Sequence, residues 1–124
     1  MTSSALEQAV RVYVAAWSTA DEAARRALLG RCFAAEGRYV DPAAQVHGRD
    51  ALVAHARRFA DRWPGSSIAL TSGVDEHNGA GCFTWRVVGP DGETLRDYVA
   101  VDGDGRLNEV RGFFGSYRSP HQTD

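Results

Sequence analysis

The chain has 124 residues and a formal net charge of −2, with 44% hydrophobic and 24% charged residues. This length fits one domain with its own core, and the slightly acidic charge gives no basic surface for nucleic acid. No apolar run approaches the about 20 residues of a membrane span, and the first residues lack a secretion signal, so we expect a cytoplasmic protein. Cys32 and Cys82 are isolated, and reduced thiols are the simplest expectation, although the sequence leaves a disulfide between them open.

Two helices are predicted at the start of the chain. Ser4–Glu7 fits a capping box, and apolar residues with helical spacing follow it. The inward-facing stripe of this first helix consists of Leu6, Val10, Tyr13, Val14 and Trp17. Residues 19–22 repeat the capping signature and predict a second helix that runs to about Leu29 and is ended by Gly30. Phe33 is then expected to anchor a loop under the core.

A short strand and a third helix come next. Tyr39 and Val40 favour a strand. Asp41-Pro42 ends it, because proline fixes its own φ and disfavours helix in the residue before it. Residues 45–47 predict a second strand. A helix is then predicted from about Arg49 to Arg62, before Pro64-Gly65. Its inner stripe consists of Leu52, His55, Ala56, Phe59 and Trp63.

The pattern changes to period two after residue 66. Strands are predicted over residues 67–75, 81–88, 94–101 and 106–115, with turn sequences such as Asn78-Gly79 between them. Helices followed by an antiparallel meander indicate an α+β fold. A strongly curved, mainly antiparallel sheet around three helices makes a cone, whose open end suits a small apolar ligand. We expect residues 1–118 to form this single domain and residues 119–124 to form a polar tail.

The alternation of residues sorts the strand faces. The predicted core face carries Phe83, Trp85, Val87, Leu95, Asp97, Val99, Val101, Val110, Gly112 and Phe114. Asp97 is the anomaly, because acids are rarely buried unless they are paired. Two interpretations stay open: Asp97 pairs with an arginine or caps a turn, or it is held neutral for a functional purpose.

Other candidate residues also have two interpretations. Asp41 either accepts backbone N–H groups in a turn or is a reactive carboxylate at a rigid strand end. Tyr13 and His55 are either hydrogen-bonded core residues or polar groups of a site. The histidines fall in different elements without metal-binding spacing, and nucleotide or dinucleotide glycine motifs are missing from the sequence, so we expect neither a metal nor a cofactor.

Several segments resemble one known family. Val12–Trp17, Tyr39–Pro42 and Gly48–Leu52 resemble the SnoaL-like branch of the nuclear transport factor 2-like superfamily, and Gly105–Gly115 is similar to that superfamily's last strand. This resemblance covers nearly the whole chain and implies the cone-shaped α+β fold. It is less specific for activity, because one fold hosts many functions.

The closest mechanistic likeness is to ketosteroid isomerase. The resemblance implies that Asp41 is a general base and that Tyr13 and a protonated Asp97 donate hydrogen bonds to an enolate oxygen. His55-Ala56 departs from the tyrosine-rich network of those enzymes, and Trp17 replaces a smaller residue. The substrate implied is therefore a small or flat apolar carbonyl compound, not a steroid.

Three hypotheses follow. The first is a cofactor-independent isomerase or polyketide cyclase that uses Asp41, Asp97 and Tyr13. The second is a non-catalytic small-molecule-binding module. Under either of these, the ligand-binding residues are expected to be Trp17, Tyr39, His55, Phe59, Trp63, Trp85, Val99 and Phe114. The third is a dimerisation module, and we expect a homodimer in any case, through the outer sheet face that carries Arg96, Tyr98, Arg111 and Phe113.

Overall fold

The computed structural model describes residues 4–89, 94–103, 106–114 and 120–121, with residues 94–103 described by their backbone alone. Within these ranges the elements, in chain order, are α1 (Ala5–Ser18), α2 (Glu22–Cys32), β1 (Phe33–Asp41), β2 (Ala44–His47), α3 (Arg49–Arg62), β3 (Ser67–Leu70), β4 (Asp75–His77), β5 (Ala80–Val88), β6 (Thr94–Gly103) and β7 (Leu107–Phe114). The predicted α+β class is confirmed.

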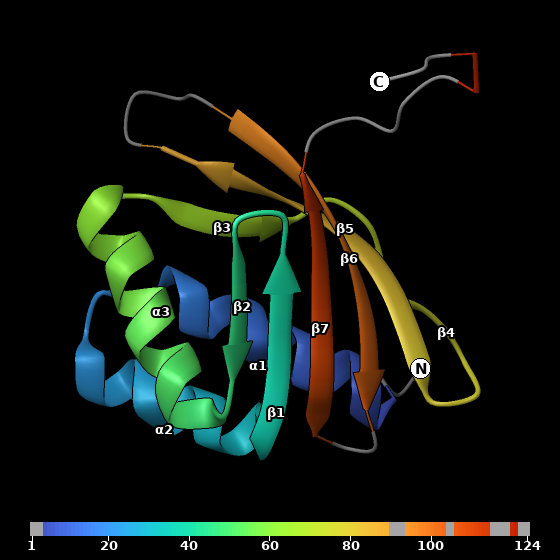
Figure 1. Cartoon of the computed structure of the whole chain (residues 1–124), viewed down its shortest axis with the longest axis horizontal. Coiled ribbons are helices and arrows are strands. Elements are labelled where there is room, and N and C mark those ends of the chain that lie inside the picture. Colours follow the sequence, from blue (N-terminus) through green and yellow to red (C-terminus); the bar gives the residue numbers. More distant parts are fainter. Residues whose placement is uncertain (1–3, 90–93, 104–105, 115–119, 122–124) are drawn as a thin grey trace.

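The strands form one curved sheet with the order β2-β1-β7-β6-β5-β3, and β4 pairs with β5 beside this path. The strands β1 and β7 run parallel, whereas the other described pairs are antiparallel. The helices lie together against one face of the sheet, with α1 crossing behind the central strands (Figure 1). The mainly antiparallel sheet that the sequence predicts is therefore confirmed.

The first helix begins and packs largely as predicted. Ser4 Oγ accepts a hydrogen bond from the Glu7 N–H at 3.0 Å, which satisfies one free donor of the first turn. The carboxylate of Glu7 pairs with Arg11 at 3.0 Å. Tyr13 and Trp17 are buried with the rest of the stripe, while Val14 is only partly buried. This places two aromatic residues of α1 inside the fold.

The second helix differs from the prediction at both ends. Its N-cap is Asp21, whose carboxylate accepts the Ala24 N–H at 2.9 Å. The expected end at Gly30 is wrong, because the helix continues through Cys32, a buried residue one turn beyond the buried Leu29. Burial of this last turn outweighs the weak helix propensity of glycine. Phe33 is not in a loop, since it is the first residue of β1.

A buried arginine joins α2 to the end of α1, and no sequence pattern predicted it. Arg25 is 1% exposed, and its guanidinium donates to the Glu22 carboxylate at 2.7 Å and to the Thr19 carbonyl at 2.6 Å. A buried charge of this kind is tolerated because it is paired and hydrogen-bonded. Arg25 therefore holds the backbone turn between the two helices.

The third helix has the predicted bounds. Gly48 precedes it with φ +94°, a conformation that favours glycine, and donates its N–H to the Gly37 carbonyl at 2.7 Å. Val53 joins Leu52 and Ala56 in the buried set. The prediction that Trp63 lies on the buried stripe is wrong: Trp63 is the C-cap and is 43% exposed, since the chain leaves the helix there.

The strand predicted over residues 67–75 is also wrong in extent, because the chain forms β3 and β4 with a break between them. At the break, the Thr71 N–H donates to the Thr84 carbonyl at 2.9 Å, and Ser72 Oγ accepts the Thr84 N–H at 2.8 Å. The turn at Asn78-Gly79 is confirmed, with φ of 51° and 82° between the paired His77 and Ala80.

The predicted faces of β5 and β7 are largely confirmed. Phe83, Trp85 and Val87 are buried and alternate with more exposed neighbours. In β7, a register shift opposite residues 102–103 puts both Leu107 and Val110 in the core. The side chain of Phe114 differs from the expected core position, because it sits at the strand end and is 49% exposed.

Cys32 is buried, Cys82 is exposed, and both are free thiols, so the two residues do not form a disulfide. None of the helices in the described part of the chain is both long and apolar enough to cross a membrane.

Candidate functional site

Asp41 is the last residue of β1 and pairs with Ala44, the first residue of β2. The turn between the two strands directly follows Asp41. Its Oδ1 atom accepts the Ala43 N–H at 2.7 Å, the bond that an aspartate at the start of a turn commonly makes. The turn role inferred from the sequence is therefore confirmed for one carboxylate oxygen. The residue is half-buried, which leaves the carboxylate near both the interior and the solvent.

The second oxygen of this carboxylate binds a tyrosine on the same strand. The Tyr39 hydroxyl donates to Asp41 Oδ2 at 2.5 Å, and Tyr39 itself is 4% exposed. Residues two apart on a strand share a face, so the pairing follows from the strand geometry. The ligand-binding role of Tyr39 stays a prediction, and the structure adds that its hydroxyl orients Asp41. The sequence signal for this hydrogen bond is the spacing of two residues between Tyr39 and Asp41 on one predicted strand.

Tyr13 approaches the same region from α1. It is 3% exposed, and its ring stacks on Phe33 with centroids 6.4 Å apart. Burial raises the pKa of the Tyr13 hydroxyl far above its usual range, and the negative charge of Asp41 raises it further. Tyr13 is consequently a neutral hydrogen-bond donor at any physiological pH, close enough to Asp41 to respond to its charge.

His55 approaches from α3. Its ring lies 5.3 Å from the Tyr39 ring and 5.8 Å from the Trp17 ring, centroid to centroid. Burial lowers the pKa of His55, although the charge of Asp41 acts in the opposite direction. Since the ordinary pKa of histidine is about 6.5, His55 is neutral at neutral pH. The charge of Asp41 therefore acts on a phenol from α1 and on a neutral imidazole from α3.

Trp17 is the centre of the aromatic cluster behind this position. Its ring centroid lies 5.6 Å from that of Tyr39, 5.5 Å from that of Phe59 and 6.2 Å from that of Tyr13. Such separations are typical of favourable aromatic pairs. The indole Nε1 of Trp17 is buried, and hydrogen bonding from Trp17 opposes part of the rise that burial causes in the pKa of Tyr13.

A hollow of about 430 Å³, which we call the aromatic hollow, opens between the ends of α1 and α3 and the start of β3. Its apolar wall includes three of the predicted ligand-binding residues, Trp17, Phe59 and Trp63. The rest of its lining consists of Ser18, Thr19, Ala20, Ala60, Asp61, Pro64, Gly65, Ser66 and Ser67. Its volume falls in the range of small-molecule pockets. Trp17 therefore belongs both to this hollow and to the cluster around Asp41.

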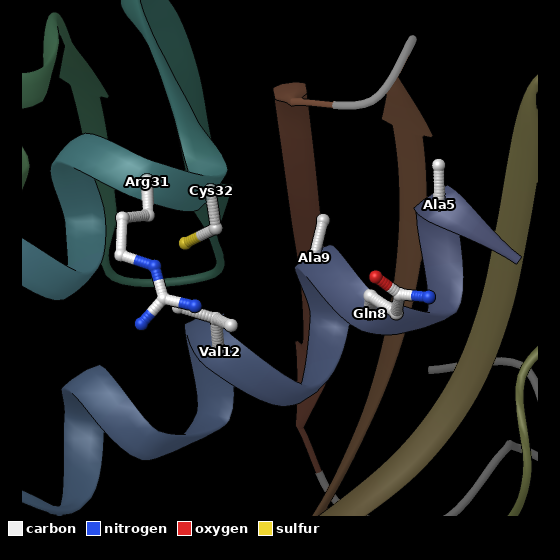
Figure 2. Close-up of a pocket in the computed structure, with 6 residues that line it drawn as sticks. All are labelled: Ala5, Gln8, Ala9, Val12, Arg31 and Cys32. Carbon is white, nitrogen blue, oxygen red and sulfur yellow. The ribbon is translucent and has the colours of Figure 1, made fainter. Parts of the chain in front are cut away.

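A smaller hollow of about 180 Å³ lies between α1 and α2, away from Asp41 (Figure 2). Residues of α1 form one side, and Arg31 and Cys32 of α2 form the other. Burial raises the pKa of the Cys32 thiol to about 12, so the thiol stays protonated and is a weak nucleophile. This hollow contains none of the residues that the sequence analysis selected.

Three more of the predicted site residues, Asp97, Val99 and Trp85, lie on β5 and β6. The side chains of Asp97 and Val99 lie outside the described residues, and only the backbone register is given, in which Asp97 pairs with Trp85 and Phe114. Trp85 is 7% exposed, and its buried Nε1 has no hydrogen-bond acceptor in the described part of the chain.

Gly112 brings β7 close to the strand end of Asp41. A Cβ atom on Gly112 would lie 3.4 Å from the Asp41 Cβ and 3.8 Å from both the Phe114 ring and the Tyr39 hydroxyl. The lack of a side chain at this position therefore keeps space around the Tyr39–Asp41 pair. The Phe114 ring lies on the same side of Gly112 and is 49% exposed, and its role as a ligand-binding residue stays a prediction.

Among the described residues, groups of three or more histidine, cysteine or acidic side chains that could hold a metal ion are missing. The chemistry available at the site is that of a carboxylate, a neutral imidazole and phenol donors beside an apolar wall. These groups suit proton transfer and hydrogen bonding.

Comparisons with known proteins bear on this arrangement. A family model described as the SnoaL-like domain matches residues 10–116. A solved structure of a candidate isomerase of the SnoaL-like family from Agrobacterium tumefaciens is similar, with a TM-score of 0.79 and 31% sequence identity, and the match covers 90% of this chain and 98% of that chain. No curated protein matches the sequence.

More distant structures share the fold alone. A candidate ketosteroid isomerase from Kribbella flavida has a TM-score of 0.68 and 19% identity, over 96% of this chain and 84% of that one. A candidate SnoaL-like polyketide cyclase from a Jannaschia species has a TM-score of 0.69 and 16% identity, over 92% of this chain and 90% of that one. The predicted cone-shaped fold of the nuclear transport factor 2-like class is confirmed by these neighbours.

Proposed function

We propose that this chain, which belongs to the SnoaL-like domain family, is a cofactor-independent isomerase or cyclase that acts on a small apolar carbonyl compound. Family membership and fold leave the activity open, since this fold carries many functions. The proposal is therefore argued from the residues around Asp41.

The observation that supports the proposal most is the convergence on Asp41. Its charge acts on the Tyr13 hydroxyl of α1 and on the His55 ring of α3, while Tyr39 and the backbone of Ala43 hold its two oxygens. A positioned carboxylate with a neutral donor nearby is the arrangement that proton abstraction beside a carbonyl needs.

In the proposed reaction, Asp41 takes a proton from the carbon next to the substrate carbonyl. The C–H bond breaks and an O–H bond forms on Asp41. The electron pair of the C–H bond becomes the C=C bond of an enolate, and the π pair of the carbonyl moves onto its oxygen. Tyr13 stabilises that oxygen by donating a hydrogen bond, because burial keeps the phenol protonated. An isomerase returns the proton to a different carbon. In a cyclase the enolate carbon attacks a second carbonyl, and the alkoxide formed there takes the proton from Asp41.

Asp97 is proposed as a further donor to the enolate oxygen, in its protonated form. The support is the resemblance to ketosteroid isomerase together with the backbone register, which sets Asp97 beside Trp85 and Phe114. A protonated carboxylic acid is a strong donor where an apolar surrounding keeps it neutral. Replacing Asp97 with alanine should then slow the reaction more than replacing it with asparagine, which keeps an N–H donor.

The test compares the natural protein with its Asp41→Asn variant, and both are given a cyclic β,γ-unsaturated ketone as the substrate. Isomerisation is followed by the ultraviolet absorbance of the conjugated product, and exchange of the α-protons with deuterium is followed by NMR, which also detects a cyclase-type base. We expect Asp41→Asn to lower both rates by about 100-fold or more. Asp50→Asn is the control, because Asp50 is 91% exposed and pairs only with Arg26 among the described residues.

The non-catalytic binding module is the second candidate. It is favoured by the hydrogen bonds that already occupy both Asp41 oxygens and by the aromatic hollow, which could hold an apolar ligand without any chemistry. If the natural protein binds the ketone but promotes neither exchange nor isomerisation, and Asp41→Asn binds equally well, the binding module is the correct function.

A further inference from the structure

His55 has no part in the proposed reaction, yet it lies one side chain away from the candidate base. Its ring packs against the Tyr39 ring, with centroids 5.3 Å apart, and the Tyr39 hydroxyl donates to Asp41 Oδ2 at 2.5 Å. Tyr39 is 4% exposed, whereas His55 is only half-buried. His55 is therefore a second titratable group beside the Tyr39–Asp41 pair, and solvent reaches it.

The ring nitrogens of His55 are open to a proton. Neither nitrogen has a hydrogen-bond partner in the described part of the chain, and neither is a buried, unsatisfied atom there. A histidine that serves only to fill a core usually has its polar atoms satisfied by a partner. A neutral imidazole carries one N–H donor and one lone pair, so it can accept a proton on one nitrogen and release one from the other. His55 thus has the chemistry of a proton carrier.

The charges around His55 favour a proton transfer from Asp41. Burial and the Arg58 guanidinium on the same helix lower the pKa of His55, so at neutral pH the ring is neutral and can accept a proton. The carboxylate of Asp41 on β1 acts in the opposite direction. That negative charge exists only after Asp41 has released its proton, so it stabilises the imidazolium at the end of the transfer. The neighbour on α1, Trp17, is uncharged and contacts the imidazole edge-on, with centroids 5.8 Å apart.

We infer that His55 is the second proton-transfer residue of the proposed reaction, which takes the substrate proton from Asp41 and exchanges it with water. The O–H bond on Asp41 breaks, an N–H bond forms on His55, and the imidazolium releases its other proton to solvent. The reverse path carries a proton from water through His55 and Asp41 to the product carbon. A carboxylic acid is ordinarily a stronger acid than imidazolium by about two to three pH units, which favours the first transfer, directly or through one bridging water molecule. This inference rests on the proposed function, to which it adds a route to solvent.

The isotope content of the product tests this route. The protein isomerises a cyclic β,γ-unsaturated ketone in D₂O, and NMR gives the fraction of product that carries deuterium at the new C–H bond at early conversion. We expect most of the product of the natural protein to carry deuterium there. His55→Phe keeps a ring against Tyr39 and Trp17 but carries no proton. We expect its Asp41 to return the substrate's own proton, so that the ratio of deuterated to undeuterated product falls by about fivefold or more.

Two controls separate proton transfer from a structural effect. His47→Gln should leave the isotope ratio unchanged, because the His47 side chain is 66% exposed and lies beside Glu36. Imidazole added to His55→Ala should restore the deuterium content, a result that lost packing alone does not give. If His55→Phe keeps the isotope ratio of the natural protein, Asp41 exchanges its proton with water by itself, and the inference is wrong.

A second measurement needs no substrate. The titration of His55 is followed by NMR of its imidazole signals in the natural protein and in Asp41→Asn. We expect the pKa of His55 to be lower in Asp41→Asn, because the negative charge that supports the imidazolium is lost. An unchanged pKa would show that the two groups lie too far apart for proton transfer and would overturn the inference.

These results are separable from a failure of the proposed function. Isomerisation with equal isotope ratios in the natural protein and His55→Phe supports the enzyme and rejects the transfer through His55. A natural protein that neither isomerises the ketone nor exchanges its α-protons rejects the enzyme and this transfer together. Isomerisation with a lowered isotope ratio in His55→Phe, and with a His55 pKa that responds to Asp41→Asn, supports both.

Discussion

The Tyr39 hydroxyl donates a 2.5 Å hydrogen bond to Asp41 Oδ2 from two residues earlier on the same strand. Because Tyr39 is buried and its ring is packed against Trp17 and His55, the hydroxyl has little freedom to move. The carboxylate is thus oriented by a fixed partner instead of by solvent. A hydrogen bond to an ionised group of this kind is stronger than one between neutral groups.

Removing this partner should affect activity more than folding. We expect Tyr39→Phe to lower kcat/KM for the β,γ-unsaturated ketone by about 10- to 100-fold, since a misplaced base loses the benefit of orientation. The free energy of unfolding, measured with urea, should fall by about 1 kcal/mol. The matched control is Tyr39→Phe in the Asp41→Asn background, where the substitution should have little further effect on rate. An equal effect in both backgrounds would contradict the orienting role.

Replacing Gly37 or Gly30 with alanine should change the stability of the protein in opposite directions. A Cβ on Gly37 would lie 2.5 Å from the Phe33 ring, which is fully buried, so Gly37→Ala should lower the free energy of unfolding by about 1–3 kcal/mol. Gly30 lies inside α2 with no atom within 4 Å of its Cβ position, and Gly30→Ala should stabilise the protein by about 0.5–1 kcal/mol. Urea unfolding of both variants tests this pair. A stabilised Gly37→Ala would show that the Phe33 ring moves freely.

The lowered pKa of His55 predicts a dependence of stability on pH. Protonation is harder in the folded chain than in the unfolded chain, so the unfolded state binds more protons below the ordinary histidine pKa of about 6.5. The stability that neutral His55 provides is present above that pH and is lost as the pH falls towards its lowered folded pKa. We expect His55→Gln to reduce the difference between urea midpoints at neutral and mildly acidic pH.

The control for His55 is His47→Gln. The His47 side chain is 66% exposed and lies 3.8 Å from the Glu36 carboxylate. Its replacement should leave the difference between the two midpoints nearly unchanged, because the His47 side chain is largely exposed. If both histidine variants behave alike, the acid sensitivity arises elsewhere in the chain.

The homodimer predicted from the sequence stays a proposal. On the part of β7 that the structure describes, Phe113 is 53% exposed and stands next to the charged Arg111. A large exposed apolar residue is one mark of an interaction surface. If the outer sheet face is the interface, Phe113→Glu should convert a dimer into a monomer in light scattering, whereas Glu36→Gln on the same sheet should not. A monomeric natural protein would reject the proposal outright.

Local signals in the sequence predicted the elements that depend on local chemistry. The third helix has the predicted bounds because Gly48 and Pro64-Gly65 mark its ends by backbone preference alone. The second helix does not end at Gly30, because burial of Cys32 belongs to the packing between elements. The break between β3 and β4 was likewise missed, since its hydrogen bonds come from Thr84 on another strand.

The candidate site likewise combines residues that the sequence predicts with contacts that it does not. The sequence analysis selected Tyr13, Trp17, Tyr39, Asp41 and His55, and the structure brings these residues together. The hydrogen bond between Tyr39 and Asp41 was not predicted, although their spacing of two residues puts both side chains on one face of β1. The positions of the Asp97 and Val99 side chains stay predictions.

The parallel pairing of β1 with β7 has a consequence for how the protein is made. Among the described strands β7 comes last in the sequence, yet it lies inside the sheet, between β1 and β6. Until β7 has left the ribosome, both of these strands present open edges, which are sites for pairing with other chains. The sheet can therefore close only after β7 has been synthesised, and a chain cut short before β7 is exposed to aggregation along both edges.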